Sequence, residues 1–265
     1  MVSESLALPS IITLNQDLDR ILNGGVQLGR ITEFCGMPGI GKTQMGIQLA
    51  INTFIPDEYG GCAGCAIYID TEGSFMVERA VEMATSLVNY IESLINDQKV
   101  LNVVPKKLTL SYILQNLHYY RVYDYIELIA LIGQLADIVK ELNANRDDGR
   151  GLIRCIVIDS ITFHFRACDQ FKDMAQRARL LSTVASQLTV VANSFNVAIV
   201  LVNQMTTKPG FGIVPALGET WSHHASTRIL LEKAPNSNMK RALILKSPDL
   251  APSYALYQVT PDGIR

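Results

Sequence analysis

The sequence lacks long apolar runs, a secretory signal and a strong charge of either sign. No stretch of its 265 residues approaches the ~20 apolar residues that a membrane-spanning helix needs, so no membrane partner is predicted. The N-terminus has no basic segment followed by an apolar one, which excludes a recognisable secretory signal peptide. The formal net charge is −2, so nucleic-acid binding would have to depend on a local basic patch.

Cysteine is scarce and lacks the spacing of a metal site. Of the five cysteines, Cys62 and Cys65 form a single C-x-x-C pair, without a second pair at zinc spacing. A tetrahedral zinc site needs four ligands, and the four histidines are not spaced to complete one. Reduced thiols of a cytosolic or nuclear protein are the favoured interpretation, with zinc or redox chemistry at the pair as the alternative.

What the sequence does contain is an alternation of short apolar runs and longer helical patterns, typical of an α/β fold with a mostly parallel sheet between helices. Strands are predicted at residues 30–35, 65–70, 117–122, 154–159, 197–203, 227–232, 242–246 and 255–259. Helices are predicted at about residues 43–55, 76–97, 124–143 and 172–195. The last three strands lack intervening helices, which predicts hairpins, and residues 96–109 and 143–151 are predicted surface loops. The absence of repeats favours one domain.

A phosphate-binding motif stands between the first of these strands and the first helix. It matches G-x-x-x-x-G-K-[ST] and comprises Gly36, Met37, Pro38, Gly39, Ile40, Gly41, Lys42 and Thr43, followed by Gln44 as a further nucleotide-binding residue. Glycines let main-chain N–H groups converge on phosphates, and the helix N-terminus adds partial positive charge. Lys42 is predicted to reach the β- and γ-phosphates and Thr43 to ligate Mg²⁺. ATP and Mg²⁺ are therefore the predicted cofactors, with an incidental glycine turn as the alternative.

Three other apolar runs end in polar residues, and the carboxyl ends of parallel strands form the ligand-binding edge of such a sheet. Asp159 ends one run and is predicted to hold the magnesium, through water. Glu72 follows another and is predicted to orient and deprotonate the attacking water, although Asp70 and Glu72 could instead merely cap the next helix. Gln204 ends the third and is predicted to sense the γ-phosphate; the irregular stretch 206–218 after it is either a switch loop or a solvated linker.

These motifs resemble the RecA-type recombinases of the eukaryotic and archaeal branch over nearly the whole chain. The matching stretches are Gly36–Thr43, Asp70–Phe75, Glu78-Arg79, Asp159-Ser160, Asn203-Gln204 and His224–Thr227. Residues 203–208 and 214–221 are similar to one group of paralogues in this family, which acts in homologous-recombination repair. The resemblance implies a P-loop NTPase fold with a RecA-type core and C-terminal antiparallel strands.

The resemblance also implies roles for individual residues around the nucleotide. Lys42, Glu72 and Gln204 are the implied catalytic residues. Arg79 is expected to pack against the adenine, and His224 is expected, with Gln204, to contact or sense the γ-phosphate. A segment matching Lys246, Ser247, Pro248 and Asp249 caps the nucleotide of the next protomer in such assemblies. Active recombinases carry an acid, which would hold a monovalent cation, where this chain has Lys246. We expect the ammonium group of Lys246 to take the place of that cation, so that ATP-dependent association is insensitive to potassium. The alternative is that Lys246 is simply solvated.

Two loops of the family bind DNA, and they map to about residues 161–176 and 205–221 of this chain. Basic side chains that contact phosphates, together with aromatic side chains that stack on bases, would suit single-stranded DNA. Phe163 and Phe165 could supply the stacking, although they could equally belong to the core. The predicted DNA-binding residues are Arg166, Lys172, Arg177 and Lys208.

The function implied by the resemblance is that of a DNA-dependent ATPase, weak when alone, in a recombinase-paralogue complex that helps the main recombinase load on single-stranded DNA. The expected partners are single-stranded and branched DNA, other paralogues and the main recombinase, in a hetero-oligomer or with ATP-driven self-association, in the nucleus and also the cytoplasm. A structural adaptor that binds ATP without needing turnover is one alternative, and a hexameric helicase motor is another.

We interpret residues 1–265 as one ATPase domain, with 1–15 as a linker remnant. The family's N-terminal helical domain, its Phe-x-x-Ala linker peptide and its basic tail are not recognisable, so long filaments are not expected.

Overall fold

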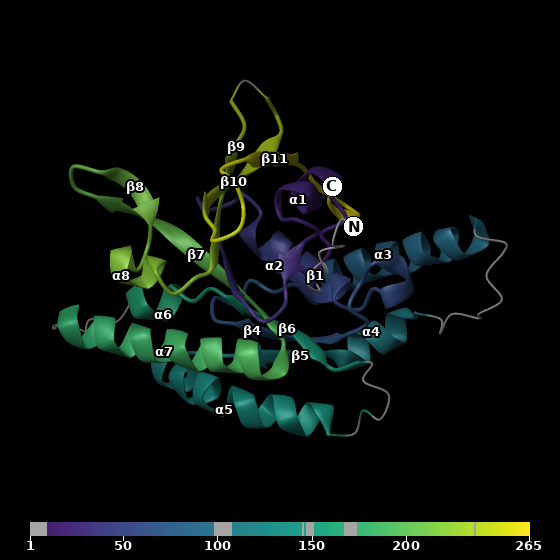
Figure 1. Ribbon diagram of the computed structural model, residues 1–265, viewed down its shortest axis with the longest axis horizontal. Coiled ribbons are helices and arrows are strands. Elements are labelled where there is room, and N and C mark those ends of the chain that lie inside the picture. The colour runs from purple at the N-terminus through teal and green to yellow at the C-terminus, as the bar shows by residue number, and fades with distance from the viewer. Residues whose placement is uncertain (1–9, 98–107, 145, 147–150, 167–173, 236) are drawn as a thin grey trace, which may run out of the picture.

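A sheet of nine strands forms the centre of the molecule (Figure 1). The computed structural model describes residues 10–97, 108–144, 146, 151–166, 174–235 and 237–265. The strand order is β11-β10-β9-β3-β7-β6-β4-β5, and β8 pairs with β7 outside this path. The strands are β3 (Ile31–Gly36), β4 (Cys65–Asp70), β5 (Leu117–Arg121), β6 (Ile153–Asp159), β7 (Ala198–Lys208), β8 (Gly212–Pro215), β9 (Thr227–Lys233), β10 (Lys240–Lys246) and β11 (Tyr254–Tyr257).

The strands from β9 to β5 in this order run parallel, and β10 and β11 add antiparallel hairpins at one end. β4 is buried along its whole length and β6 almost so, because helices cover both faces of the sheet. The predicted fold class, the eight predicted strands and the C-terminal hairpins are therefore confirmed.

Four long helices cover the sheet, at the positions that their periodicity predicts: α2 (Lys42–Asn52), α3 (Val77–Asp97), α5 (Tyr125–Asn143) and α7 (Met174–Phe195). Figure 1 shows α5 and α7 side by side along one face, while α2 and α3 pack together on the other side of the sheet. Short elements without a periodic pattern were not predicted. They are α1 (Gln16–Ile21), η1 (Asp57–Tyr59), α4 (Leu110–Asn116), α6 (Phe163–Arg166), α8 (Gly218–Ser222), β1 (Ser10–Ile11), β2 (Val26–Gln27), β12 (Val259–Thr260) and β13 (Gly263–Ile264).

The stretch after Gln204 is more regular than the sequence indicates. β7 continues to Lys208 and pairs antiparallel with β8, from Met205 opposite Pro215 to Lys208 opposite Gly212. Gly210 and Gly212 have φ of 78° and 79°, which lets the chain reverse between the two strands. The prediction of an irregular loop or a linker is therefore wrong over this hairpin, although a switching role for it stays a prediction.

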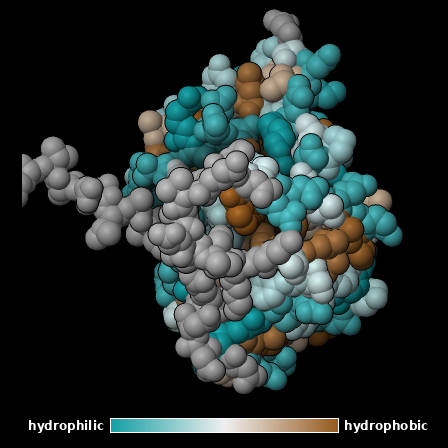
Figure 2. Space-filling view, turned by 90° about the vertical axis from the view of Figure 1, so that its right-hand side faces the viewer, coloured by the Kyte–Doolittle hydropathy of each residue, from teal (hydrophilic) through white to brown (hydrophobic). Residues whose placement is uncertain are grey.

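No helix in the part of the chain that is described combines the length and the apolar character needed to cross a bilayer. The face shown in Figure 2 mixes hydrophilic residues with separate apolar patches. Much of the two predicted surface loops, 96–109 and 143–151, lies outside the described residues.

Candidate active site

The glycine-rich loop joins the end of β3 to the start of α2, at the carboxyl edge of the sheet. Gly41 precedes the helix with φ 106°, and a Cβ there would lie 3.0 Å from Val259 Cγ2. A Cβ on Gly36 would lie 2.5 Å from the carbonyl oxygen of Leu231. Only glycine fits these two positions, and α2 then directs its unpaired N–H groups into the loop, as phosphate binding requires.

Lys42 folds back over this loop. Its Nζ donates to the carbonyl oxygens of Gly36 at 2.8 Å and Met37 at 3.0 Å. Burial lowers the pKa of this ammonium, and the nearby Asp159 and Glu72 carboxylates raise it. Phosphate oxygens in the loop would offer Lys42 charged acceptors in place of the two carbonyls, and such charge-assisted hydrogen bonds are stronger.

Asp159 lies at the end of β6 and is 2% exposed. Its Oδ2 accepts a hydrogen bond from the Tyr68 hydroxyl at 2.9 Å. The pKa of Asp159 is raised to about 6: burial is the largest cause, hydrogen bonds from Thr43 and Tyr68 partly oppose it, and the charges of Glu72 and Asp70 add to it. A carboxylate beside the Thr43 hydroxyl fits Mg²⁺, which prefers oxygen ligands. The described residues hold no cluster of three or more metal-ligating side chains, so most of the remaining ligands would be phosphate oxygens and water.

The raised pKa of Asp159 predicts a pH-dependent effect of Asp159→Asn in the metal-free protein. Above pH ~6 the folded wild type carries a buried charge that the unfolded chain exposes, so the asparagine variant should be more stable by about 2–3 kcal/mol. As the pH falls from about 6 to 4, the folded wild type takes up a proton and this difference should vanish. Urea unfolding in EDTA from pH 8 to 4 measures it, and a difference that is constant with pH would contradict it.

The two acids at and just after the end of β4, Asp70 and Glu72, have separate tasks. Asp70 Oδ1 accepts hydrogen bonds from the main-chain N–H groups of Glu72 at 3.1 Å and Gly73 at 2.7 Å, so Asp70 stabilises the turn. Glu72 takes no such part in the hydrogen bonds that are described: its Oε1 accepts from the Ser160 hydroxyl and, at 2.6 Å, from Gln204 Nε2. The capping alternative therefore fits Asp70 and not Glu72.

Arg79 lies beside the loop and is held at its edges. Its Nε donates to Gln44 Oε1 at 2.6 Å, and its Nη1 donates to Glu82 at 2.8 Å. The two terminal nitrogens also donate to the carbonyls of Thr260 and Pro261, in the turn between β12 and β13. With these edges engaged, an adenine would meet the planar face of the guanidinium, and packing there stays a prediction.

Tyr257, on β11, fixes the loop from behind. Its buried hydroxyl donates to the Ile40 carbonyl at 3.0 Å, and burial raises its pKa. Tyr257→Phe should leave that carbonyl unpaired, lower the free energy of unfolding by about 1–2 kcal/mol and weaken ATP binding. Urea unfolding and titration with a fluorescent ATP analogue test this. Tyr254→Phe is the matched control, because Tyr254 is 57% exposed; equal effects of the two variants would contradict the prediction.

His224 and the predicted cap lie away from this loop. The N–H of Ser226 binds the carbonyl of Ile31 at 2.9 Å, which places His224 at the amino end of β3, while the glycine-rich loop follows its carboxyl end. At ~3.3 Å per residue the strand separates the two edges by roughly 15 Å or more. His224 Nε2 lies 3.3 Å from Ser182 Oγ instead. The structure does not bring His224 to the glycine-rich loop of its own chain, so its expected role stays a prediction for a nucleotide held by another subunit.

Lys246 belongs to the same edge. Its Nζ donates to the carbonyls of Ser222 at 2.9 Å, His223 at 3.1 Å and Ala225 at 2.8 Å, at the end of α8. Lys246 is also partly exposed, so a role of its charge beside phosphates stays a prediction, as does the alternative of a solvated lysine. Asp249 pairs with Arg30 nearby, and the cap function of Lys246, Ser247, Pro248 and Asp249 likewise stays a prediction.

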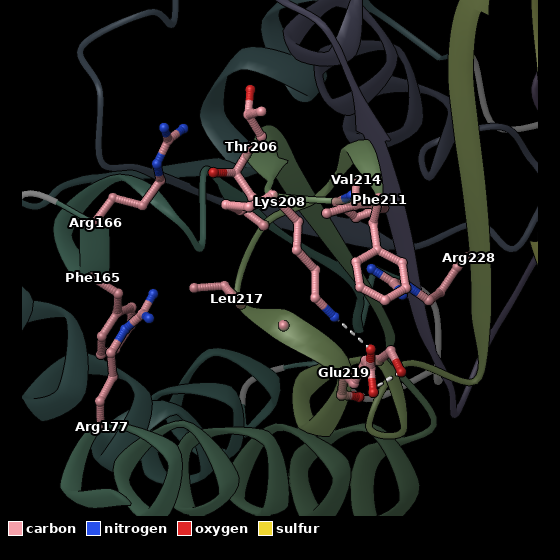
Figure 3. A pocket seen from close by; sticks show the side chains of 16 residues that line it. Phe165, Arg166, Arg177, Thr206, Lys208, Phe211, Val214, Leu217, Glu219 and Arg228 are labelled. Atoms are coloured by element: carbon pink, nitrogen blue, oxygen red, sulfur yellow. Dashed lines mark hydrogen bonds and ion pairs between the residues drawn. The ribbon is translucent and has the colours of Figure 1, made fainter. Parts of the chain in front are cut away.

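Three of the four predicted DNA-binding residues line one cavity of about 640 Å³, under the β7–β8 hairpin (Figure 3). These are Arg166, Arg177 and Lys208; Lys172 lies outside the described residues. Phe165 also lines the cavity and is buried, whereas Phe163 is 39% exposed. Lys208 pairs with Glu219 at 2.8 Å and lies over the Phe211 ring, 4.3 Å from its centroid.

A buried network behind this cavity was missed by sequence analysis. Glu33 is 0% exposed and accepts from Asn203 Nδ2 at 2.5 Å, Trp221 Nε1 at 3.1 Å and Arg228 Nη2 at 2.9 Å. The available signal was the charge of Glu33 inside one apolar run and of Arg228 at the start of another, since a buried charge needs a partner. Among the described residues, the buried Nε atoms of Arg177 and Arg228, which line the cavity, have no hydrogen-bond partner.

The C-x-x-C pair has no metal-site geometry among the residues that are described. Cys62 and Cys65 are free thiols, and Cys65 is buried. Burial raises the pKa of Cys62 to about 11, which disfavours the thiolate that redox chemistry needs.

The fold and this site together define a P-loop NTPase of the RecA type. The Rad51 family model matches residues 6–265, and the chain belongs to the Rad51 family. Proteins of this family are ATPases in general and use ATP and Mg²⁺. The resemblance seen in the sequence is thus confirmed.

Individual relatives support the same family and indicate a paralogue group. The chain is 42% identical over 263 residues to "DNA repair protein RAD51 homolog 3" of Dictyostelium discoideum, covering 97% of this chain and 65% of that protein. It is 38% identical over 264 residues to the protein of the same name from Cricetulus griseus, covering 96% and 68%. It is 32% identical over 269 residues to "DNA repair and recombination protein RadA" of Aeropyrum pernix, covering 99% and 75%. The chain spans about two thirds of the length of the first two relatives.

Proposed function

We propose that this chain is the ATP-binding, slowly hydrolysing and DNA-dependent subunit of a recombinase-paralogue complex. It assists homologous-recombination repair in the nucleus by helping the main recombinase load on single-stranded DNA. The observation that carries the proposal is that Lys42, Asp159 and Glu72 lie together at one edge of the sheet. The charges of both acids raise the pKa of Lys42 against the effect of burial, and Glu72 is hydrogen-bonded to Gln204. Gln204 belongs to β7, the strand that continues into the hairpin over the basic cavity.

Slow turnover by the isolated chain follows from the same geometry. Glu72 is the candidate general base, and two donors already occupy its Oε1. At least one of these hydrogen bonds must break before Oε1 can accept a proton from the attacking water. His224 and Lys246 lie at the far edge of the sheet and can act only on a nucleotide of another subunit. Efficient hydrolysis would therefore need a neighbour, which agrees with a hetero-oligomer of paralogues.

Single-stranded DNA suits the cavity because it offers anionic phosphates and flat bases. Arg166, Arg177 and Lys208 supply cations, and Phe211 supplies an aromatic face. Lys208 is already paired with Glu219, whereas Arg177 Nε is unpaired in the described structure, so Arg177 has more to gain from a phosphate. The unpartnered nitrogen predicts the larger loss of affinity for Arg177→Ala.

The salt dependence of binding tests this DNA site. Arg177→Ala should reduce the slope of log K against log salt concentration by about 0.7, the value for one phosphate contact of a single strand. Fluorescence anisotropy with labelled oligo(dT) at several salt concentrations measures the slope. Lys140→Ala is the control, because Lys140 is exposed on α5 and pairs with Asp137. A slope that Arg177→Ala leaves unchanged would place the DNA elsewhere.

The assembly itself is tested by size-exclusion chromatography with light scattering. The chain, alone and with its paralogue partners, is run with ATP and Mg²⁺ or with ADP, each with and without single-stranded DNA. We expect ATP, and not ADP, to increase the mass of the complex and DNA to join it. No saturable uptake of Mg-nucleotide under any of these conditions would end the proposal.

A structural adaptor is the second candidate, and a specific observation favours it. Tyr257 and Arg79 tie the glycine-rich loop and its flank to the C-terminal strands, so a bound nucleotide would stiffen the region even without turnover. An adaptor of this kind needs ATP binding by Lys42 but not the chemistry of Glu72. Complementation of repair by the corresponding variants therefore separates the two candidates.

A further inference from the structure

The side-chain amide of Gln204 lies between two charged groups, and each of them can bind only one end of this amide. Gln204 Oε1 accepts from Arg166 Nη1 at 2.7 Å, and Gln204 Nε2 donates to Glu72 Oε1 at 2.6 Å. An arginine can only donate, so it requires the amide oxygen; a carboxylate can only accept, so it requires the amide nitrogen. Arg166 therefore determines that the donor end of Gln204 faces Glu72.

This orientation keeps Glu72 in a resting state. The Ser160 hydroxyl donates to the same Oε1, so this oxygen receives two hydrogen bonds. An oxygen that already accepts from two donors is not free to accept the proton of the attacking water. Gln204 can rotate away only if its oxygen loses Arg166.

Arg166 is placed to leave. It ends the short helix α6, its residue is exposed, and it lines the same cavity as Arg177 and Lys208 (Figure 3). Burial lowers the pKa of Arg177, and the positive charge of Arg166 lowers it further, so the two guanidinium groups also repel each other in this part of the cavity. A phosphate group entering here would compete with the neutral amide oxygen of Gln204, and hydrogen bonds between charged partners are roughly twice as strong as neutral ones.

We propose that Arg166 is a positioning residue that latches Gln204 onto Glu72 while the cavity is empty, and that a phosphate of single-stranded DNA releases the latch by drawing Arg166 away. DNA in the cavity is thereby linked to whether the Glu72 carboxylate at the ATP site is free to accept a proton. The inference rests on the proposed function for its ligand and for the reaction that Glu72 performs. It assigns to Arg166 the link between the two sites.

The kinetic test compares the wild type with Arg166→Met, which removes the charge and keeps the length. The DNA-free rate of ATP hydrolysis should rise by about tenfold, because one charge-assisted hydrogen bond is lost, and added oligo(dT) should raise it little further. Arg20→Met is the matched control. Arg20 is an exposed arginine that pairs with Asp17, and both residues lie far from Arg166 in the sequence. An Arg166→Met rate at or below that of the wild type without DNA would overturn the latch.

A second measurement does not need hydrolysis. In protein labelled with ¹⁵N-glutamine, the side-chain amide signal of Gln204 is identified by its loss in Gln204→Glu. Oligo(dT) should shift this signal in the wild type, and DNA-free Arg166→Met should already show the shifted position. Arg177→Met should keep the wild-type position without DNA, since the described side-chain partners of Gln204 are Arg166 and Glu72 and do not include Arg177.

The two measurements distinguish a failure of the proposed function from a failure of the latch. If the wild type takes up no nucleotide, the proposed function fails while the Gln204 signal still tests the latch. If the wild type hydrolyses ATP but the signal is the same with and without Arg166, the latch is wrong and the proposed function stands. Equal melting temperatures of the variants, measured alongside, ensure that a change of rate is not a change of folding.

Discussion

Replacing Glu72 by glutamine is expected to lower the rate of ATP hydrolysis by about 10²–10⁴-fold, the contribution of a positioned general base. Affinity for Mg-ATP should change little, because Glu72 is not among the groups that cradle the phosphates. Glutamine has nearly the same shape and retains an oxygen that can accept from Ser160 and Gln204. Single-turnover hydrolysis and equilibrium titration with a fluorescent ATP analogue separate the two effects.

Lys42→Ala is the variant to compare with Glu72→Gln, because it should impair ATP binding itself. Lys42 Nζ is the cation that lies over the glycine-rich loop, and hydrogen bonds from a charged group contribute about 1.5–3 kcal/mol each. Its loss should therefore weaken ATP binding by about 10–100-fold and remove hydrolysis with it. A structural adaptor would tolerate Glu72→Gln and fail with Lys42→Ala in a repair assay, whereas a subunit that needs turnover would fail with both. Hydrolysis at the wild-type rate by Glu72→Gln would remove the role assigned to this carboxylate.

The largest loss of stability is expected from Glu33→Ala, which should lower the free energy of unfolding by about 3–5 kcal/mol. The cause is the charge left behind: Arg228 is 8% exposed and pairs with Glu33 at 2.9 Å. Two neutral donors, Asn203 Nδ2 and Trp221 Nε1, lose their acceptor at the same time. Urea unfolding followed by fluorescence measures the change, since Trp221 is the single tryptophan of the chain.

A double variant distinguishes this explanation from a simple loss of packing. Glu33→Leu combined with Arg228→Met replaces the ion pair by apolar groups of similar size, which often restores or exceeds the original stability. We expect the double variant to be markedly more stable than Glu33→Ala. A cost below about 1 kcal/mol for Glu33→Ala would mean that the network contributes no more than an exposed pair.

The local features of the site could be predicted because each depends on a short stretch of chain. The motif Gly36–Thr43 determines its own backbone geometry through its glycines and the helix that follows. Asp159 and Gln204 end or closely follow apolar runs, and parallel strands bring such ends to one edge. The contact of Gln204 with Glu72 fulfils that expectation at 2.6 Å.

Other residues of the site depend on partners that no local pattern reveals. Glu33 and Arg228 are separated by 195 residues, and Arg166 and Gln204 by 38, so their pairing follows only from strand order and helix placement. The hairpin of β7 and β8 escaped prediction because glycines and prolines obscure its strand pattern. It forms because β7 offers an unpaired edge beyond the sheet, where β8 can complete the hydrogen bonds.

The sequence by itself determined the family, the order of strands and helices along the chain and the loop that would hold a triphosphate, since these follow from apolar periodicity and from a motif whose glycines have a local geometric task. Only the tertiary structure decided that His224 and Lys246 lie at the opposite edge of the sheet from the glycine-rich loop. It also decided that Glu33 anchors a buried charge and that Arg166 reaches Glu72 through Gln204. The physical reason is common to all three: direction along a parallel strand, burial of a charge and the pairing of donor with acceptor are relations between distant parts of the chain, and they exist only once the sheet has formed.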